Sequence, residues 1–170
     1  MNRTLYEETQ RFAIWVYVTL ALTMSAVTVG QFLLLMNPPK DSDPLPPVVP
    51  IISIVVAILL ANLLFLRVRV RENDVYAQLG FLFPMMWRRI GFDKMQEYRM
   101  VKYKPLREAG GWGIRFGMFE GKPASYVNAR GDRGVLLISD KRPLIIGSQD
   151  PERLAEAIAR ALEVFQRARG

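Results

Sequence analysis

The sequence predicts a membrane-anchored protein: an N-terminal transmembrane helical hairpin, then a mainly-β small barrel of about seven antiparallel strands closed by one C-terminal α-helix. Three observations predict it. Residues 13–36 and 48–66 carry no charged side chain, residues 67–146 alternate repeatedly with period two, and residues 151–165 carry an apolar helical stripe. We therefore divide the chain into residues 1–66, with the hairpin, and a domain of residues 67–170.

Each uncharged run is long enough to be a membrane span. As helices, residues 13–36 would extend roughly 36 Å and residues 48–66 roughly 28 Å, close to the thickness of a bilayer core. Trp15 and Tyr17 stand near the start of the first run, as interfacial aromatic residues do. Two buried core helices are the alternative. A signal peptide fits the first run poorly, because the run is long and Glu7 and Glu8 precede it.

The distribution of basic residues predicts the orientation of the hairpin. The connecting segment, NPPKDSDPLPP, is short and proline-rich, and Lys40 is its one basic residue. The outer ends are flanked by Arg3, Arg11, Arg67, Arg69 and Arg71. Because basic residues favour the cytoplasmic side, we expect a multi-pass protein of the cell membrane with both termini in the cytoplasm. Gln31 and Asn62 are the amides within the spans, and we expect them to hold helices together.

Short strands follow the second span. We expect them at residues 67–72, 75–79, 85–90, 97–104, 112–118, 124–128, 135–139 and 143–146. In PLREAGGWGIRFG, the pair Gly110-Gly111 favours a tight turn between two strands. The alternation after this turn places Trp112, Ile114, Phe116 and Met118 on one face, which we assign to the barrel interior. Arg115 projects from the other face, either to pair with Glu108 or to contact a partner.

The C-terminal segment has the signals of one amphipathic helix. Asp150 is a candidate N-cap and Pro151 suits the first helical position. The apolar stripe consists of Leu154, Ala157, Ile158, Ala161, Leu162 and Phe165. We expect this helix to cover one open end of the barrel. A membrane-surface helix is the alternative, and the glutamates on its polar face disfavour it.

Three segments of the second domain resemble a group of prokaryotic membrane proteins with a pleckstrin-homology-like (PH-like) domain. They are KYKPLREAGGWGIRFG (102–117), NARGDRGVLLISD (128–140) and RPLIIGSQDPERLAEAI (142–158). The resemblance implies a bent seven-stranded antiparallel barrel with a C-terminal helix. Eukaryotic PH domains often bind phosphoinositides through basic residues between their first two strands. Here that turn is Asn73-Asp74, which lacks a basic cluster.

The composition excludes several kinds of site. The chain has no Cys and no His, so thiol chemistry, disulfides and the usual zinc or iron–sulfur ligand sets are excluded. The carboxylates are scattered, and GGWGIRFG lacks the lysine and the strand-to-helix context of a phosphate-binding loop. We expect no catalytic residues, no cofactor and no metal. The net charge of +7 suits an anionic surface, and anchoring at a bilayer disfavours nucleic acid.

These observations predict a non-enzymatic module that mediates protein interaction or assembly at the cytoplasmic face of the membrane. Its partners would be the bilayer and either another protein or further copies of the chain, in a homo-oligomer. The interaction candidates are Arg107 and Arg115. The alternative is recognition of anionic lipid headgroups by basic residues next to the membrane: Arg67, Arg69, Arg71, Arg88 and Arg89.

Overall fold

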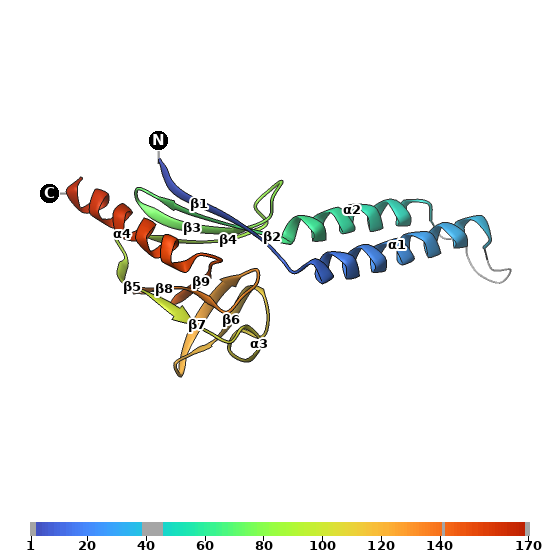
Figure 1. The fold of residues 1–170 in the computed structure, drawn as a ribbon. Helices are drawn as coiled ribbons and strands as arrows, with labels where there is room; N and C mark the ends of the chain where they lie inside the picture. The colour runs from blue at the N-terminus through green and yellow to red at the C-terminus, as the bar shows by residue number, and fades with distance from the viewer. Residues whose placement is uncertain (1–2, 39–45, 141, 169–170) are drawn as a thin grey trace.

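The structure is a computed structural model that describes residues 3–38, 46–140 and 142–168. Figure 1 shows a long helical hairpin that projects from a β domain. In chain order, the elements are β1 (Thr4–Arg11), α1 (Ile14–Met36), α2 (Val48–Leu63), β2 (Phe65–Arg71), β3 (Asp74–Leu79), β4 (Met86–Gly91), β5 (Met95–Lys102), α3 (Pro105–Glu108), β6 (Gly113–Phe119), β7 (Lys122–Asn128), β8 (Arg133–Ser139), β9 (Leu144–Gly147) and α4 (Pro151–Arg167).

The first strand, β1, was not predicted from the sequence. It pairs with β2 in antiparallel register, with Glu7 opposite Arg69 and Gln10 opposite Leu66. At the base of the hairpin the N–H of Phe12 donates to the carbonyl of Leu64 (3.4 Å). The hairpin is therefore inserted between two neighbouring strands. α1 begins, and α2 ends, at the same end of the first sheet (Figure 1).

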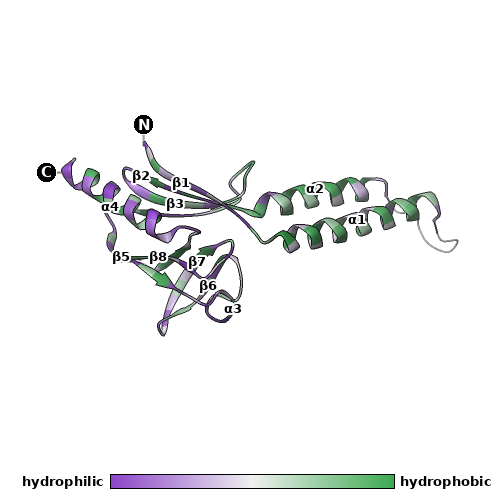
Figure 2. Ribbon diagram, viewed as in Figure 1, coloured by the Kyte–Doolittle hydropathy of each residue, from purple (hydrophilic) through white to green (hydrophobic). Residues whose placement is uncertain are grey.

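The two apolar helices lie side by side and are apolar around most of their surface (Figure 2). Among the described residues, α1 is the one helix long and apolar enough to cross a membrane, and α2 is a shorter apolar helix. None of the residues of α1 is buried, so the alternative of two buried core helices is wrong. The span predicted over residues 48–66 was too long, because the chain leaves the helix at Leu64 and Phe65 and Leu66 pair within the sheet.

One of the two amides in the hairpin helices holds the helices together as expected. The hydroxyl of Ser53 on α2 donates to Oε1 of Gln31 on α1 (2.9 Å). The other amide, Asn62, contacts the loop between β3 and β4 instead.

All eight strands expected after the hairpin are present, but they form two sheets. One has the order β1-β2-β3-β4 and the other β5-β8-β9-β7-β6. The closed, wholly antiparallel barrel predicted from the sequence is wrong for the described residues. β9 lies between β8 and β7 and pairs in parallel with β7, so the second sheet is not wholly antiparallel. Within the ranges that the structure describes, the edge strands of the first sheet, β1 and β4, do not pair with the edge strands of the second, β5 and β6, so the barrel is not closed.

The C-terminal helix packs against both sheets, as its apolar stripe predicted (Figure 1). Leu154, Ala157, Ile158 and Ala161 are buried in one cluster with valines of β2 and β8. Oδ1 of Asp150 accepts a hydrogen bond from the N–H of Arg153 (3.1 Å), which confirms the predicted N-cap. The alternative of a membrane-surface helix is wrong.

Polar side chains of β1 fasten the first sheet to the second. The amide of Gln10 donates to the carbonyl of Gly147 at the end of β9 (2.6 Å). The carboxylate of Glu8 accepts from the hydroxyl of Ser148 (2.6 Å) and from the N–H of Gln149 (2.7 Å). Because these bonds join opposite ends of the chain, β1 is an integral part of the β domain.

We expect Glu8→Ala to lower the free energy of unfolding by about 2–3 kcal/mol, because a half-buried carboxylate leaves two hydrogen bonds to the β9–α4 connection unmade. The neighbouring Glu7→Ala is the matched control. Glu7 is 42% exposed and makes surface ion pairs, so its loss should cost less than about 1 kcal/mol. Urea unfolding in detergent micelles, followed by tryptophan fluorescence, measures both. Equal stabilities of the two variants would contradict the fastening role of β1.

Candidate binding cleft

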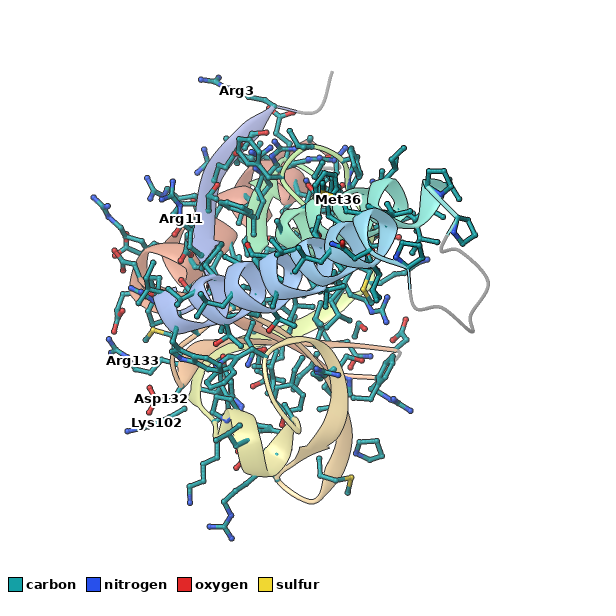
Figure 3. The ribbon with its side chains drawn as sticks, turned by 90° about the vertical axis from the view of Figure 1, so that its right-hand side faces the viewer. Arg3, Arg11, Met36, Lys102, Asp132 and Arg133 are labelled. Atoms are coloured by element: carbon teal, nitrogen blue, oxygen red, sulfur yellow. The ribbon has the colours of Figure 1, made fainter. Side chains whose placement is uncertain are left out.

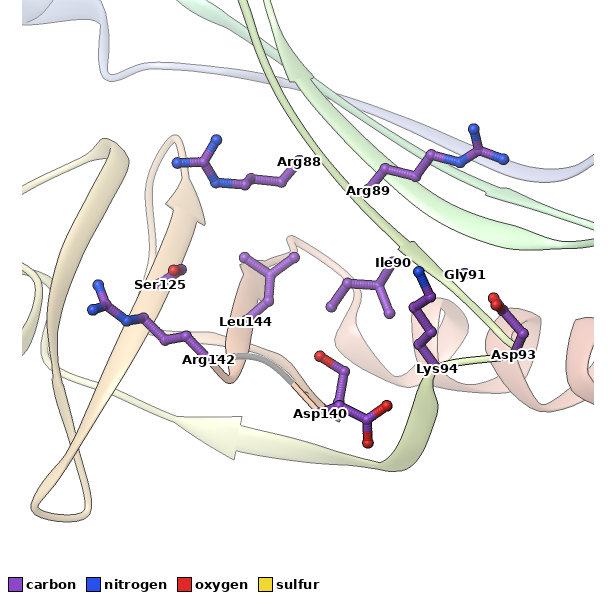
Figure 4. A pocket seen from close by; sticks show the side chains of 11 residues that line it. Arg88, Arg89, Ile90, Gly91, Asp93, Lys94, Ser125, Asp140, Arg142 and Leu144 are labelled. Carbon is purple, nitrogen blue, oxygen red and sulfur yellow. The ribbon is translucent and has the colours of Figure 1, made fainter.

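A cleft of about 660 Å³ lies between β4 of the first sheet and the second sheet. Figure 4 shows its walls: Arg88 to Gly91 on one side, and Ser125, Leu144 and Arg142 on the other. Asp93, Lys94 and Asp140 stand at its end. Ile90 and Leu144 are the large apolar side chains of its lining, and most of the other lining side chains are charged. Such a hollow with a few charged groups is a candidate ligand site.

Two arginines from opposite walls of this cleft, Arg88 on β4 and Arg142 in the β8–β9 connection, contact one aromatic ring. The guanidinium of Arg88 lies 5.5 Å from the ring centroid of Phe116, and that of Arg142 lies 5.2 Å from the same centroid. The ring of Phe116 therefore holds two cations close together, as aromatic faces do. In Figure 4 both guanidinium groups point to the same side.

The predicted core position of Phe116 is wrong. Its side chain is 61% exposed and Met118 is 50% exposed, whereas Ile114 packs against the main core. β6 is an edge strand of the second sheet, so only part of its apolar face is covered. Period-two alternation predicted that Ile114, Phe116 and Met118 share a face of β6. It could not predict that Arg88 of the first sheet would lie against Phe116.

The adjacent arginine, Arg89, has a different environment. It pairs with the carboxylate of Asp74 (2.8 Å), and the side chain of Asp74 is fully buried. A buried carboxylate needs a compensating charge, so the positive charge of Arg89 stabilises the folded domain and is not free for a ligand. In Figure 4 the head groups of Arg88 and Arg89 point in opposite directions.

The arginines of β2 also contact residues of their own sheet. Arg67 and Arg69 both pair with Glu7 on β1, at 3.3 and 3.0 Å. The guanidinium of Arg71 lies 4.8 Å from the ring centroid of Tyr76. Because β1 was not predicted, the ion pairs with Glu7 were not predicted either. Since Arg67 and Arg69 contact Glu7, Arg71 contacts Tyr76, Arg88 contacts Phe116 and Arg89 contacts Asp74, the five headgroup candidates do not form one cluster.

The segment PLRE forms the short helix α3, not the strand that was predicted. Pro105 occupies its first turn, and Glu108 accepts a hydrogen bond from the N–H of Lys104 (2.9 Å). Arg115 donates to the carbonyl of Trp112 (3.0 Å) and is not paired with Glu108, so that alternative is wrong, and contact of Arg115 with a partner stays a prediction. α3 lies directly on β6, where a Cβ on Gly117 would meet the carbonyl of Glu108.

A second hollow, of about 680 Å³, lies beside α3 and is lined in part by Arg107, Lys104 and Tyr103. Burial raises the pKa of Tyr103 to about 12, so its phenol stays protonated at neutral pH. Lys102 pairs with Asp132 at the rim of this hollow (3.3 Å) (Figure 3). The structure places Arg107 here and Arg115 on β6, so neither interaction candidate lines the cleft beside β4.

Sequence reasoning missed Lys94 and Arg142 as site residues. Both lie in short connections, which the sequence marks only as turns. The cleft exists because the β4–β5 and β8–β9 connections come together in space, and no local pattern encodes that approach. In the part of the chain that the structure describes, no group of three or more His, Cys, Asp or Glu side chains is placed to hold a metal ion.

Comparisons of the chain with protein-family models, with curated proteins and with solved structures gave no match.

The two neighbouring arginines of β4 should differ in their effect on stability. Arg89→Gln leaves the buried carboxylate of Asp74 without its cation, and we expect a loss of about 1–3 kcal/mol, reduced by the exposure of the guanidinium to water. Arg88→Gln removes a contact with an exposed ring and an exposed hydrogen bond to the carbonyl of Trp87 (3.1 Å), and it should cost less than about 1 kcal/mol. Urea unfolding of both variants measures the difference. A larger loss for Arg88→Gln would refute this division of roles.

Proposed function

We propose that this chain is an integral membrane protein whose α1–α2 hairpin holds the β domain at the cytoplasmic face, and that the domain binds an extended acidic segment of a partner protein in the cleft beside β4. The observation that carries the proposal is the position of that cleft. It joins the free edge of a strand to a group of cations from β4 and from the β4–β5 and β8–β9 connections: Arg88, Lys94 and Arg142.

Two features support the membrane part. α1 is about 34 Å long, enough to cross a bilayer core, and none of its residues is buried within the chain. α2 covers about 24 Å, which a bilayer accommodates by thinning or by placing flanking side chains at the interface. Arg11 and Arg67 lie at the domain end of the hairpin, which supports a cytoplasmic position for both termini.

The free edge of β4 supports binding by strand addition. Among the described residues, β4 pairs with β3 alone. The N–H of Phe92 donates to the carbonyl of Asn73 (3.0 Å), and the alternation of antiparallel pairs then directs the N–H groups of Trp87 and Arg89 away from β3. An unpaired edge of this kind is a template for another extended chain.

The charges beside this edge favour an acidic chain. An added strand would present every second side chain toward Arg88, Lys94 and Arg142. Two carboxylates, Asp93 and Asp140, are also at the cleft, and Asp140 accepts a hydrogen bond from Gln96 (2.6 Å). Lipid-headgroup recognition by Arg67, Arg69, Arg71, Arg88 and Arg89 is the weaker alternative, because ion pairs occupy three of these side chains.

A PH-like relationship of the domain is part of the same proposal. It is supported by the two packed sheets, by the C-terminal helix between them and by the sequence segments 102–117, 128–140 and 142–158. Such a fold serves many functions, so the cleft carries the functional argument.

A photo-reactive amino acid at Lys94, introduced into the full chain in its native membrane, tests this proposal. We expect it to capture a protein through an acidic, extended segment, identified by mass spectrometry of the crosslinked peptide. Capture should be lost in Arg88→Glu/Arg142→Glu. It should persist in the control Arg160→Glu, which reverses an exposed charge on α4. Crosslinks to lipid alone, or capture unaffected by reversal of the cleft charges, would contradict the proposal.

A further inference from the structure

The loop between β3 and β4 carries a concentrated group of exposed apolar side chains. The loop and the first two residues of β4, from Gly80 to Trp87, have the sequence GFLFPMMW. The large apolar side chains in it are 40–66% exposed: Phe81, Leu82, Phe83, Met85, Met86 and Trp87. A contiguous exposed apolar group of this size marks a surface that another apolar phase covers.

Asn62, in the last turn of α2, holds this loop in place. Its Oδ1 accepts from the N–H groups of Phe81 (2.9 Å) and Leu82 (2.7 Å), and its Nδ2 donates to the carbonyl of Phe83 (3.0 Å). The amide side chain is buried, at 4% exposure. The loop therefore lies at the level where the apolar hairpin meets the β domain (Figure 1).

The backbone of the loop satisfies much of its own hydrogen bonding. The N–H of Gly80 donates to Phe65 (2.9 Å) and that of Met85 to Leu79 (3.1 Å), while Pro84 has no N–H. A Cβ on Gly80 would overlap the carbonyl of Phe83, so the turn is tight and its φ of +116° suits glycine. Such a loop can enter an apolar environment at low cost, because few of its N–H groups lose a water partner.

Aromatic rings continue from this loop around the base of the hairpin. Phe81 lies 5.4 Å from Phe65 between ring centroids, and Phe65 lies 6.2 Å from Tyr17 on α1. On α1, Trp15 contacts Trp112, which directly precedes β6 (6.5 Å between ring centroids). The guanidinium of Arg67 lies 5.4 Å from the centroid of Phe81. Aromatic rings with adjacent cations at one level are typical of a membrane–water interface.

We infer that the β3–β4 loop is a third membrane-contacting element, which inserts Phe81, Leu82 and Phe83 into the interfacial region of the bilayer beside α2. The inference rests on the proposed embedding of the hairpin. It adds to that proposal a contact that fixes the orientation of the β domain toward the membrane, with Asn62 as the positioning residue. The bilayer is the occupant that the site favours, because the loop is bonded directly to the last turn of an apolar helix.

Depth-dependent fluorescence quenching tests the inference. The chain has no Cys, so one replacement gives one labelling site. We would attach an environment-sensitive fluorophore to Leu82→Cys in the full-length protein, reconstituted in phosphatidylcholine vesicles that contain lipids spin-labelled near the headgroup. The matched controls are Leu33→Cys on α1, at 55% exposure, and Lys122→Cys at the start of β7.

We expect quenching and a blue-shifted emission at position 82, and neither at position 122. Quenching at position 33, near the far end of α1, together with none at position 82, would overturn the inference and leave the embedded hairpin intact. Absence of quenching at both positions would overturn the embedding itself.

The variant Asn62→Ala tests the positioning role. We expect it to reduce quenching at position 82 severalfold and to leave quenching at position 33 unchanged, because it removes three hydrogen bonds to the loop. Unchanged quenching at position 82 would overturn the role assigned to Asn62. Circular dichroism of the same sample would show whether the β domain keeps its fold.

Discussion

The pairing of β1 with β2 is the constraint on which the rest of the structure depends. The chain forms one strand of the β domain, leaves for the hairpin and returns as the neighbouring strand. Two residues, Phe12 and Ala13, join β1 to α1, and Leu64 alone joins α2 to β2. The hairpin cannot turn far relative to the sheet with such short connections. Glu8 and Gln10 extend the constraint to the second sheet, since Gln10 bonds to the last residue of β9 and Glu8 bonds to the connection between β9 and α4.

This constraint also explains how charge and apolar surface are separated. Glu7 on β1 forms ion pairs with Arg67 and Arg69, so these two arginines beside the hairpin are paired within the first sheet. The cations that remain grouped, Arg88 and Arg142, lie on the cleft between the sheets. The large apolar side chains of the β3–β4 loop lie beside the last turn of α2. The β domain thus has one surface suited to a bilayer and another suited to an anionic chain.

Local signals predicted much of the fold, and pairing between distant segments decided the rest. Period-two alternation found eight strands, and Asp150 with Pro151 marked the start of α4 correctly. β1 escaped prediction because Thr4–Arg11 is polar at most positions and its partner lies beyond the hairpin. Asn62 looked like a helix-to-helix amide, yet its partners are 19–21 residues away in a loop. The cleft could not be predicted for the same reason, because Arg88 and Arg142 meet only through the ring of Phe116.

The central proposal is that the hairpin crosses the membrane twice and leaves both β1 and the remaining β domain on the cytoplasmic side. Labelling of single cysteines in intact cells with a membrane-impermeant maleimide tests it most directly. We predict that Asn37→Cys, at the far end of α1, is labelled from outside, and that Thr4→Cys and Lys122→Cys are labelled only after the membrane is permeabilised. Labelling of Thr4→Cys or Lys122→Cys in intact cells, or protection of Asn37→Cys, would contradict the account.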